Sequence, residues 1–108
     1  MLVHEASRSG RDALDEAWDA IRAHMLPPRD KGLIVLIAPP PGDAHAEAAR
    51  AGLENLARTL SIEWARHDVR PVAILPGEDT DPETTAELVA FLASKAGAYY
   101  AGCAFTLR

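Results

Sequence analysis

Hydrophobic positions recur along this chain in two patterns, one typical of amphipathic helices and one of buried strands. Apolar residues at helical spacing occupy the segments 12–26, 44–67 and 79–97. Short apolar runs without polar alternation lie at 1–6, 33–38, 69–75 and 102–108. Such unbroken strands are typical of parallel sheets, which are covered on both faces. We therefore expect an α/β fold, with a four-stranded parallel sheet in sequential order and three connecting helices.

The buried faces of the first two helices follow from these patterns. One stripe of the first helix carries Leu14, Ala17, Trp18, Ile21 and Met25. One stripe of the second carries Ala46, Ala49, Leu53, Leu56, Leu60 and Trp64. Because both stripes recur at helical spacing, we expect them to face the sheet. Trp18 and Trp64 are then predicted to be core anchors.

A second face of the middle helix is also apolar. Its residues are Ala44, Ala48, Ala51 and Ile62. Small side chains let a neighbouring helix approach closely, so we expect this face to be an oligomer interface. The alternative is that alanine is simply a good helix former on an exposed face, but that does not explain Ile62.

Capping residues support the helix boundaries. Asp43 and Asp81 each precede a helical segment and are expected N-caps. Pro82 suits the first turn of the third helix, and Gly97 is expected to end it.

Composition narrows the function classes. The chain has 108 residues, which suits a single domain over 1–108. Its net charge is −5 and no block of Lys or Arg stands out, so we expect no nucleic-acid or anionic-membrane partner. No apolar run reaches membrane-spanning length, and the N-terminus has no signal-peptide pattern. Cys103 is the only cysteine, which excludes an internal disulfide and favours a reducing cytoplasm.

Several stretches together resemble the second half of the short-chain dehydrogenase/reductase family. They are "MLVHEAS", "GLIVLIAP", "ARAGLENLARTLSIEWARHDVRPVAILPG" and "AELVAFLASKAGAYYAGCAFTLR". Their order and spacing are similar to the family's fourth to seventh strands, its Tyr-x-x-x-Lys helix and its Pro-Gly turn. The resemblance implies half of a doubly wound Rossmann-like domain. In that family the helix corresponding to the middle one commonly packs at a subunit interface.

The departures from the family pattern concern its catalytic and nucleotide-binding residues. The resemblance places Ala46 at the catalytic tyrosine, Arg50 at the lysine, and Ala38 or Pro39 at the serine. The early glycines are Gly10 and Gly32, and no G-x-G-x-x-G-like turn is present. Proton transfer at neutral pH needs a titratable group, and Ala46 has none. We therefore expect no catalytic residues, no bound cofactor and no family-type hydride transfer.

Weaker candidates for binding remain. Arg50 binds phosphate or ribose if it acts as the family lysine does, although we favour a solvated residue near Glu47 and Glu54. The family's Pro-Gly turn, which corresponds to Pro76 and Gly77, lies against the nicotinamide. In this chain we favour the interpretation that these two residues only form the tight turn after a strand. The metal-type residues are His4, Glu5, His45 and Glu47. Their spacing matches no ligand pattern, so we expect no metal site.

Three functions are compatible with such a half-domain. In the family the fourth strand pairs with the first, so segment 1–6 would leave an open sheet edge and an uncovered apolar face. We therefore favour a non-catalytic, oligomeric structural or interaction module, pairing with itself or with a full-length dehydrogenase-like chain. The alternative is a subunit or remnant of an NAD(P)-dependent oxidoreductase whose nucleotide-binding half another chain supplies. A third possibility is a small-ligand binder at the carboxyl ends of the strands.

Overall fold

The fold alternates strands and helices along the chain. A computed structural model describes residues 1–6, 10, 12–25 and 32–108. The strands are β1 (Leu2–Glu5), β2 (Gly32–Ile37), β3 (Val69–Leu75) and β4 (Ala104–Thr106). The helices are α1 (Ala13–Met25), α2 (Ala44–Glu63) and α3 (Pro82–Ala93), with the 3-10 turns η1 (Ala65–His67) and η2 (Ala96–Tyr99). All strand pairs are parallel in the order β1-β2-β3-β4, which confirms the predicted architecture.

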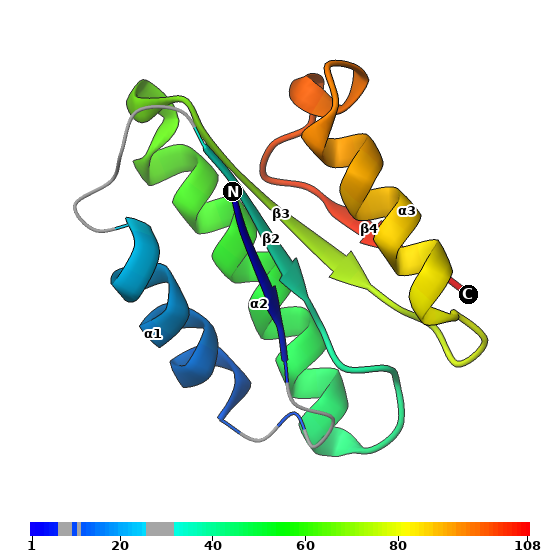
Figure 1. The fold of residues 1–108 in the computed structure, drawn as a ribbon. Coiled ribbons are helices and arrows are strands. Elements are labelled where there is room, and N and C mark those ends of the chain that lie inside the picture. Colours follow the sequence, from blue (N-terminus) through cyan, green and yellow to red (C-terminus); the bar gives the residue numbers. More distant parts are fainter. Residues whose placement is uncertain (7–9, 11, 26–31) are drawn as a thin grey trace.

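The helices are divided between the two faces of the sheet. Helices α1 and α2 pack on one face and α3 on the other (Figure 1). Since the strands are parallel and sequential, the crossovers through α1 and α2 share one hand, and the crossover through α3 has the opposite hand. In Figure 1 the first two are right-handed and the third is left-handed. Nearly all such crossovers in proteins are right-handed, so the α3 connection is unusual.

Each face has its own hydrophobic core. The α1–α2 core includes Leu2, Ile21, Ile34, Leu36, Leu53, Leu60, Trp64 and Leu75, together with smaller side chains. Helices α1 and α2 are in close contact at Gly52, where a Cβ atom would lie 3.0 Å from Leu14 Cδ1. The α3 core joins Leu33, Val35, Ile37, Val72, Ile74 and Leu92. Burial of apolar side chains on both faces is the main stabilising term of the fold.

Two predicted helix ends were wrong. Helix α2 ends at Glu63, and Trp64 begins a 3-10 turn, so the α-helix does not reach His67. Helix α3 ends at Ala93 because Ser94 is extended, and Gly97 lies within η2. Gly97 has a packing role there, since a Cβ atom on it would lie 2.2 Å from Phe91 O.

The predicted core stripe of α1 was partly wrong. Ala17 and Ile21 are buried, but Trp18 is 37% exposed and Leu14 is 46% exposed. The Met25 side chain is outside the described residues. The helix is rotated so that Ala13, Ala17 and Ile21 face the sheet, because small residues let α1 approach it closely. Trp64, by contrast, is buried as predicted.

The sheet is covered more completely than we expected. Strand β1 forms an open edge, as predicted. However, the apolar β2 and β3 side chains facing α3 are all buried, including Val35 and Val72. The expected uncovered apolar face was therefore wrong for these strands, because α3 lies across them. Exposure on this face remains at β1, where Val3 is partly exposed.

Candidate functional site

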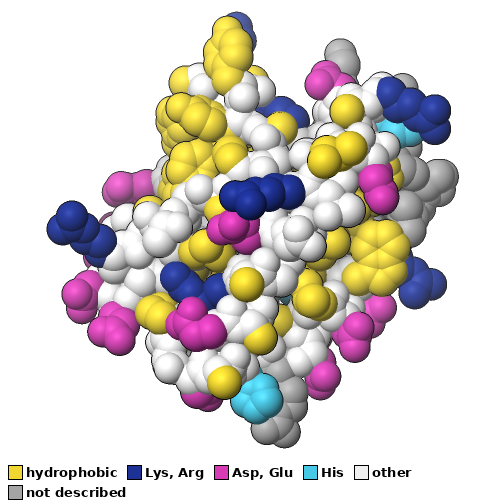
Figure 2. Space-filling view, turned by 180° about the vertical axis from the view of Figure 1, so that it is seen from behind, with side chains coloured by type: hydrophobic (Ala, Val, Ile, Leu, Met, Phe, Trp, Pro, Cys, Tyr) yellow, Lys and Arg dark blue, Asp and Glu magenta, His cyan; other side chains and the backbone are white. Residues whose placement is uncertain are grey.

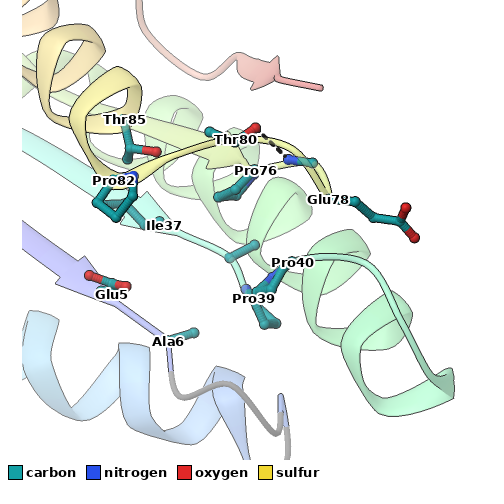
Figure 3. Close-up of a pocket in the computed structure, with 12 residues that line it drawn as sticks. Glu5, Ala6, Ile37, Pro39, Pro40, Pro76, Glu78, Thr80, Pro82 and Thr85 are labelled. Atoms are coloured by element: carbon teal, nitrogen blue, oxygen red, sulfur yellow. Dashed lines mark hydrogen bonds between the residues drawn. The ribbon is translucent and has the colours of Figure 1, made fainter.

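A hollow of about 230 Å³ lies at the carboxyl ends of the first three strands (Figure 3). Its lining comes from the ends of β1 and β2, the loops after β2 and β3, and the first turn of α3. The lining residues are Glu5, Ala6, Ile37, Ala38, Pro39, Pro40, Pro76, Gly77, Glu78, Thr80, Pro82 and Thr85. Open α/β sheets bind ligands at this end, which makes the hollow the candidate site.

Prolines shape the walls of the hollow. Pro39 and Pro40 follow β2, and Pro76 follows β3. Proline has no N–H donor, so neither strand can extend its backbone ladder through these positions. The ladder between β2 and β3 reaches Ala38, whose N–H donates to Ile74 O at 2.9 Å. Beyond that bond the ends of β2 and β3 diverge, and the hollow lies between them.

Arg50 lies behind the proline walls rather than in solvent. Its Nη1 donates to Pro39 O at 3.0 Å and also to Pro76 O. The side chain is half-buried. The prediction of a solvated residue near Glu47 and Glu54 was wrong, since Glu54 instead pairs with Arg58 at 3.1 Å. Arg50 thus contacts the two walls without lining the hollow itself.

Ala46 is outside the hollow and is packed tightly. It is 4% exposed, and its N–H donates to Asp43 Oδ1 at 3.0 Å. A Cβ atom on Gly10, which has a φ of +68°, would lie 3.1 Å from Ala46 Cα. The Gly10 backbone therefore packs against the position that the resemblance assigns to tyrosine. Because Ala46 is buried, a larger side chain at this position would have to displace its neighbours.

The polar side chains around the hollow are mostly either hydrogen-bonded to the backbone or acidic. Thr80 Oγ1 accepts from Gly77 N at 2.9 Å and donates to Arg108 O at 2.5 Å. Glu5 and Glu78 are exposed and lie at opposite ends of the group in Figure 3. The lining residues include no Lys, Arg, His or Cys. The described lining therefore offers two carboxylates and no base paired with a nucleophile.

Asp43 and Asp81 cap the two helices beside the hollow, as predicted. Asp43 accepts from Ala46 N, and Asp81 Oδ1 accepts from Thr84 N at 2.7 Å. The Ala46 N–H bond is the main cause of a lowered pKa for Asp43, and the Thr84 N–H bond is the main cause for Asp81. Both caps thus keep negative charge where the helix dipoles favour it.

The metal-type residues do not form a cluster. Among the described residues, no group of three His, Cys, Asp or Glu side chains comes together as a metal site. His4 lies on β1 on the same side as Leu2 and Ala6, while Glu5 lies on the other. The buried His4 Nε2 has no hydrogen-bond partner within the described part of the chain.

Of the weak binding candidates, Pro76 and Gly77 line the hollow and Arg50 lies behind it. Of the positions that the resemblance assigns to catalytic residues, Ala38 also lines the hollow and Ala46 lies apart. Gly77 is constrained there, because a Cβ atom on it would lie 2.1 Å from Arg108 C. Sequence reasoning missed Glu5, Thr80 and the proline walls as parts of one site. The run of three prolines after β2 could have indicated an early end to the ladder.

The expected interface residues lie on the outer surface of the α1–α2 layer. Ala44, Ala48 and Ala51 are exposed, and Ile62 is 78% exposed. Figure 2 shows this side of the molecule, with hydrophobic side chains interspersed among charged ones. No helix of the described residues is long and apolar enough to cross a bilayer.

Comparison with known proteins gives structural likeness without a family match. No family model matches the chain. Acetoin dehydrogenase from Enterobacter cloacae superposes with a TM-score of 0.76 at 22% identity, covering 97% of this chain and 60% of that one. BdcA (YjgI) from E. coli superposes with 0.75 at 22% identity, covering 87% and 49%. 4-Hydroxyisoleucine dehydrogenase, complexed with NADH and succinate, superposes with 0.68 at 21% identity, covering 90% and 52%.

The chain has a short-chain dehydrogenase/reductase-like fold. At these identities the likeness concerns the fold alone. The chain spans 49% to 60% of the length of these three dehydrogenase-like structures. The dehydrogenase-like fold places the hollow at the carboxyl ends of β1, β2 and β3, where the strand ends diverge.

Proposed function

We propose that this chain is a non-catalytic dehydrogenase-like protein that acts as an oligomeric structural or interaction module. The proposal includes the finer resemblance, in which the chain corresponds to the second half of the family fold and lacks its catalytic and nucleotide-binding motifs. The observation that carries it is the state of the expected catalytic positions. Ala46 is buried without a proton to give, and Arg50 is bound to backbone carbonyls.

The hollow also disfavours a dinucleotide. Glu5 and Glu78 are its charged lining residues, and carboxylates repel the negative charge of a pyrophosphate. Dinucleotide folds instead bring the pyrophosphate to a helix N-terminus with free N–H groups. Here Asp81 occupies that place on α3, accepting from Thr84 N. These contacts support a site that has lost its nucleotide.

Titration tests the missing cofactor. NADH and NADPH are each titrated into the protein, followed by nucleotide fluorescence and by calorimetry. We expect no saturable binding at micromolar concentration and no reduction of a test ketone. Micromolar affinity, or turnover that survives repurification, would contradict the proposal.

The outer surface of α1 and α2 is the proposed oligomer interface. The predicted residues Ala44, Ala48, Ala51 and Ile62 are exposed in the single chain. Leu14 and Trp18 of α1 add two large, partly exposed apolar side chains to this layer. Aromatic residues are enriched among the dominant contacts of protein interfaces. We propose that a second copy of this chain binds to this surface. A full-length dehydrogenase-like chain is the other partner to test.

Charged substitutions test this surface. Ala51→Glu with Ile62→Lys places two charges where packing would leave them desolvated. We expect an oligomeric wild type and a monomeric double variant by light scattering coupled to size-exclusion chromatography. The matched control puts the same charges on the exposed residues Ala86 and Ala90 of α3 and should leave the mass unchanged. A wild-type mass of one chain at tens of micromolar would contradict self-association.

Trp18 gives an independent readout of the same interface. In a Trp64→Phe variant, Trp18 is the only tryptophan, because the chain has two. We expect iodide to quench its fluorescence well at submicromolar protein and poorly at high concentration, where assembly covers it. Quenching that does not change with protein concentration would move the interface away from α1.

The second candidate function is a subunit of an NAD(P)-dependent oxidoreductase whose nucleotide half another chain supplies. Two observations favour it: β1 forms an open edge of the sheet, and this chain covers only 49% to 60% of the length of the compared structures. The test is co-expression with a dehydrogenase-like chain encoded next to this one. A stable complex that binds NADH when neither chain binds it alone would support this function over the first.

A further inference from the structure

We infer that Arg50 is a clamp that holds the carboxyl ends of β2 and β3 together and so sets the width of the hollow between them. The clamp links one side chain of α2 to a carbonyl from each strand end, Pro39 O and Pro76 O. It goes beyond the proposed function and does not depend on assembly. A protein that proved monomeric would leave the inference untouched.

The need for a clamp arises from the backbone. The register pairs Ile37 with Ile74, and the ladder continues as far as the bond from Ala38 N to Ile74 O. The next rung would require an N–H from Pro76, which proline lacks. The backbone ladder between β2 and β3 therefore ends at Ala38, so any further link between the two strand ends must come from a side chain.

The guanidinium of Arg50 supplies a side-chain link at this point. A single nitrogen, Nη1, reaches both carbonyls. Within the described residues, no carboxylate lies at ion-pair distance from this guanidinium, and the ion pair on α2 joins Arg58 and Glu54. Hydrogen bonds from a charged donor are roughly twice as strong as neutral ones, which suits a link between two separate chain segments. The partly buried cation is stabilised by carbonyl dipoles.

The clamp connects to the hollow through its walls. Pro39 and Pro76 are both lining residues, while Arg50 contacts them from behind. Loss of the clamp would free the loop after β2 to move away from the loop after β3. The hollow is therefore held at its present width by a residue that does not line it. We assign Arg50 a positioning role.

Amide hydrogen exchange tests the clamp by comparing local with global opening. The variant Arg50→Met keeps an unbranched apolar stem and removes the donors. We expect exchange at the Ala38 and Gly77 amides to become at least tenfold faster, while Val35 and Val72 in the strand centres change less than threefold. Arg50→Lys keeps a charged donor and should restore part of the protection. Arg58→Met on the same helix is the control and should change none of these four amides by more than twofold.

The wild-type protein gives a second measurement that needs no variant. Nitrogen-15 relaxation and proton exchange of the arginine side chains should show a slowly exchanging Arg50 guanidinium and a fast one at the exposed Arg58. Equally fast proton exchange and motion of the Arg50 and Arg58 guanidinium groups would overturn the inference. So would a change below twofold at Ala38 and Gly77 in Arg50→Met, or a uniform acceleration over the whole sheet.

Discussion

Arg50 and Arg70 act at opposite ends of β3, and both donate to backbone carbonyls. Arg70 lies near the amino end of the strand. Its Nη1 donates to Gly97 O at 2.9 Å and Tyr100 O at 3.1 Å, and its Nη2 donates to Leu92 O at 3.2 Å. Arg50 uses Nη1 alone, for the carbonyls of Pro39 and Pro76 at the other end.

The difference lies in what each arginine satisfies. The last carbonyls of an α-helix have no partner within the helix, and Arg70 donates to one of them, Leu92 O in α3. Its two-nitrogen fork also reaches Gly97 O in η2 and Tyr100 O beyond it. A cation there also suits the negative end of the helix dipole. Arg50 instead bridges two strand ends beyond the point where their backbone ladder stops. At the amino end of β3, three hydrogen bonds from Arg70 thus link the strand to α3 and the segment after it. At the carboxyl end, beside the hollow, a single nitrogen of Arg50 makes the link between β2 and β3.

The largest effect is expected from removing the Arg70 fork. Arg70→Met leaves the three carbonyls without their charged donor. We expect a loss of about 3 kcal/mol in the free energy of unfolding, against about 2 kcal/mol for Arg50→Met. Urea denaturation followed by circular dichroism measures both. A larger loss for Arg50→Met would reverse the comparison.

Lysine substitutions sharpen the comparison. A lysine ammonium can replace the single Nη1 of Arg50, but it cannot reproduce the two separated nitrogens that Arg70 uses. We expect Arg50→Lys to recover more than half of the stability that Arg50→Met loses, and Arg70→Lys to recover less than half of its own loss. Equal recovery at both positions, in the same urea measurement, would show that the fork geometry of Arg70 is unimportant.

The smallest effect should come from the helix caps and be visible in acid. Asp43 caps α2 beside the Arg50 end, and Asp81 caps α3. The pKa of each carboxyl is lowered below 3.8 by the backbone N–H it accepts from. A lowered folded-state pKa gives stability that is fully present above the unfolded pKa and is lost as pH falls through the folded one. Asp43→Asn and Asp81→Asn should therefore lose less stability than wild type between pH 5 and pH 2, about where these carboxyls titrate.

Urea midpoints at several pH values within that window check the prediction. Thr85→Asn is a control, since its substitution introduces the same side chain without removing a titrating cap. An acid dependence in both cap variants that equals the wild-type dependence would contradict a role for these carboxylates.

Much of the fold could be predicted from local sequence patterns. Helical spacing and unbroken apolar runs indicate the order of elements and a parallel sheet, because both depend on residues close in sequence. The caps Asp43 and Asp81 could be identified for the same reason: each bonds an N–H three residues further on. Exact ends were less predictable, as the early end of α3 at Ala93 shows.

Other features were decided only by the tertiary structure. The outward rotation that exposes Trp18, and the position of α3 on the face opposite α1 and α2, depend on how whole elements fit together. The Arg50 clamp joins residues 11 and 26 positions apart along the chain. A long, flexible side chain can reach several partners, so its sequence neighbours Glu47 and Glu54 did not reveal the two carbonyls that hold it. Local periodicity determines which elements form, whereas contacts between distant segments determine which donors and acceptors meet.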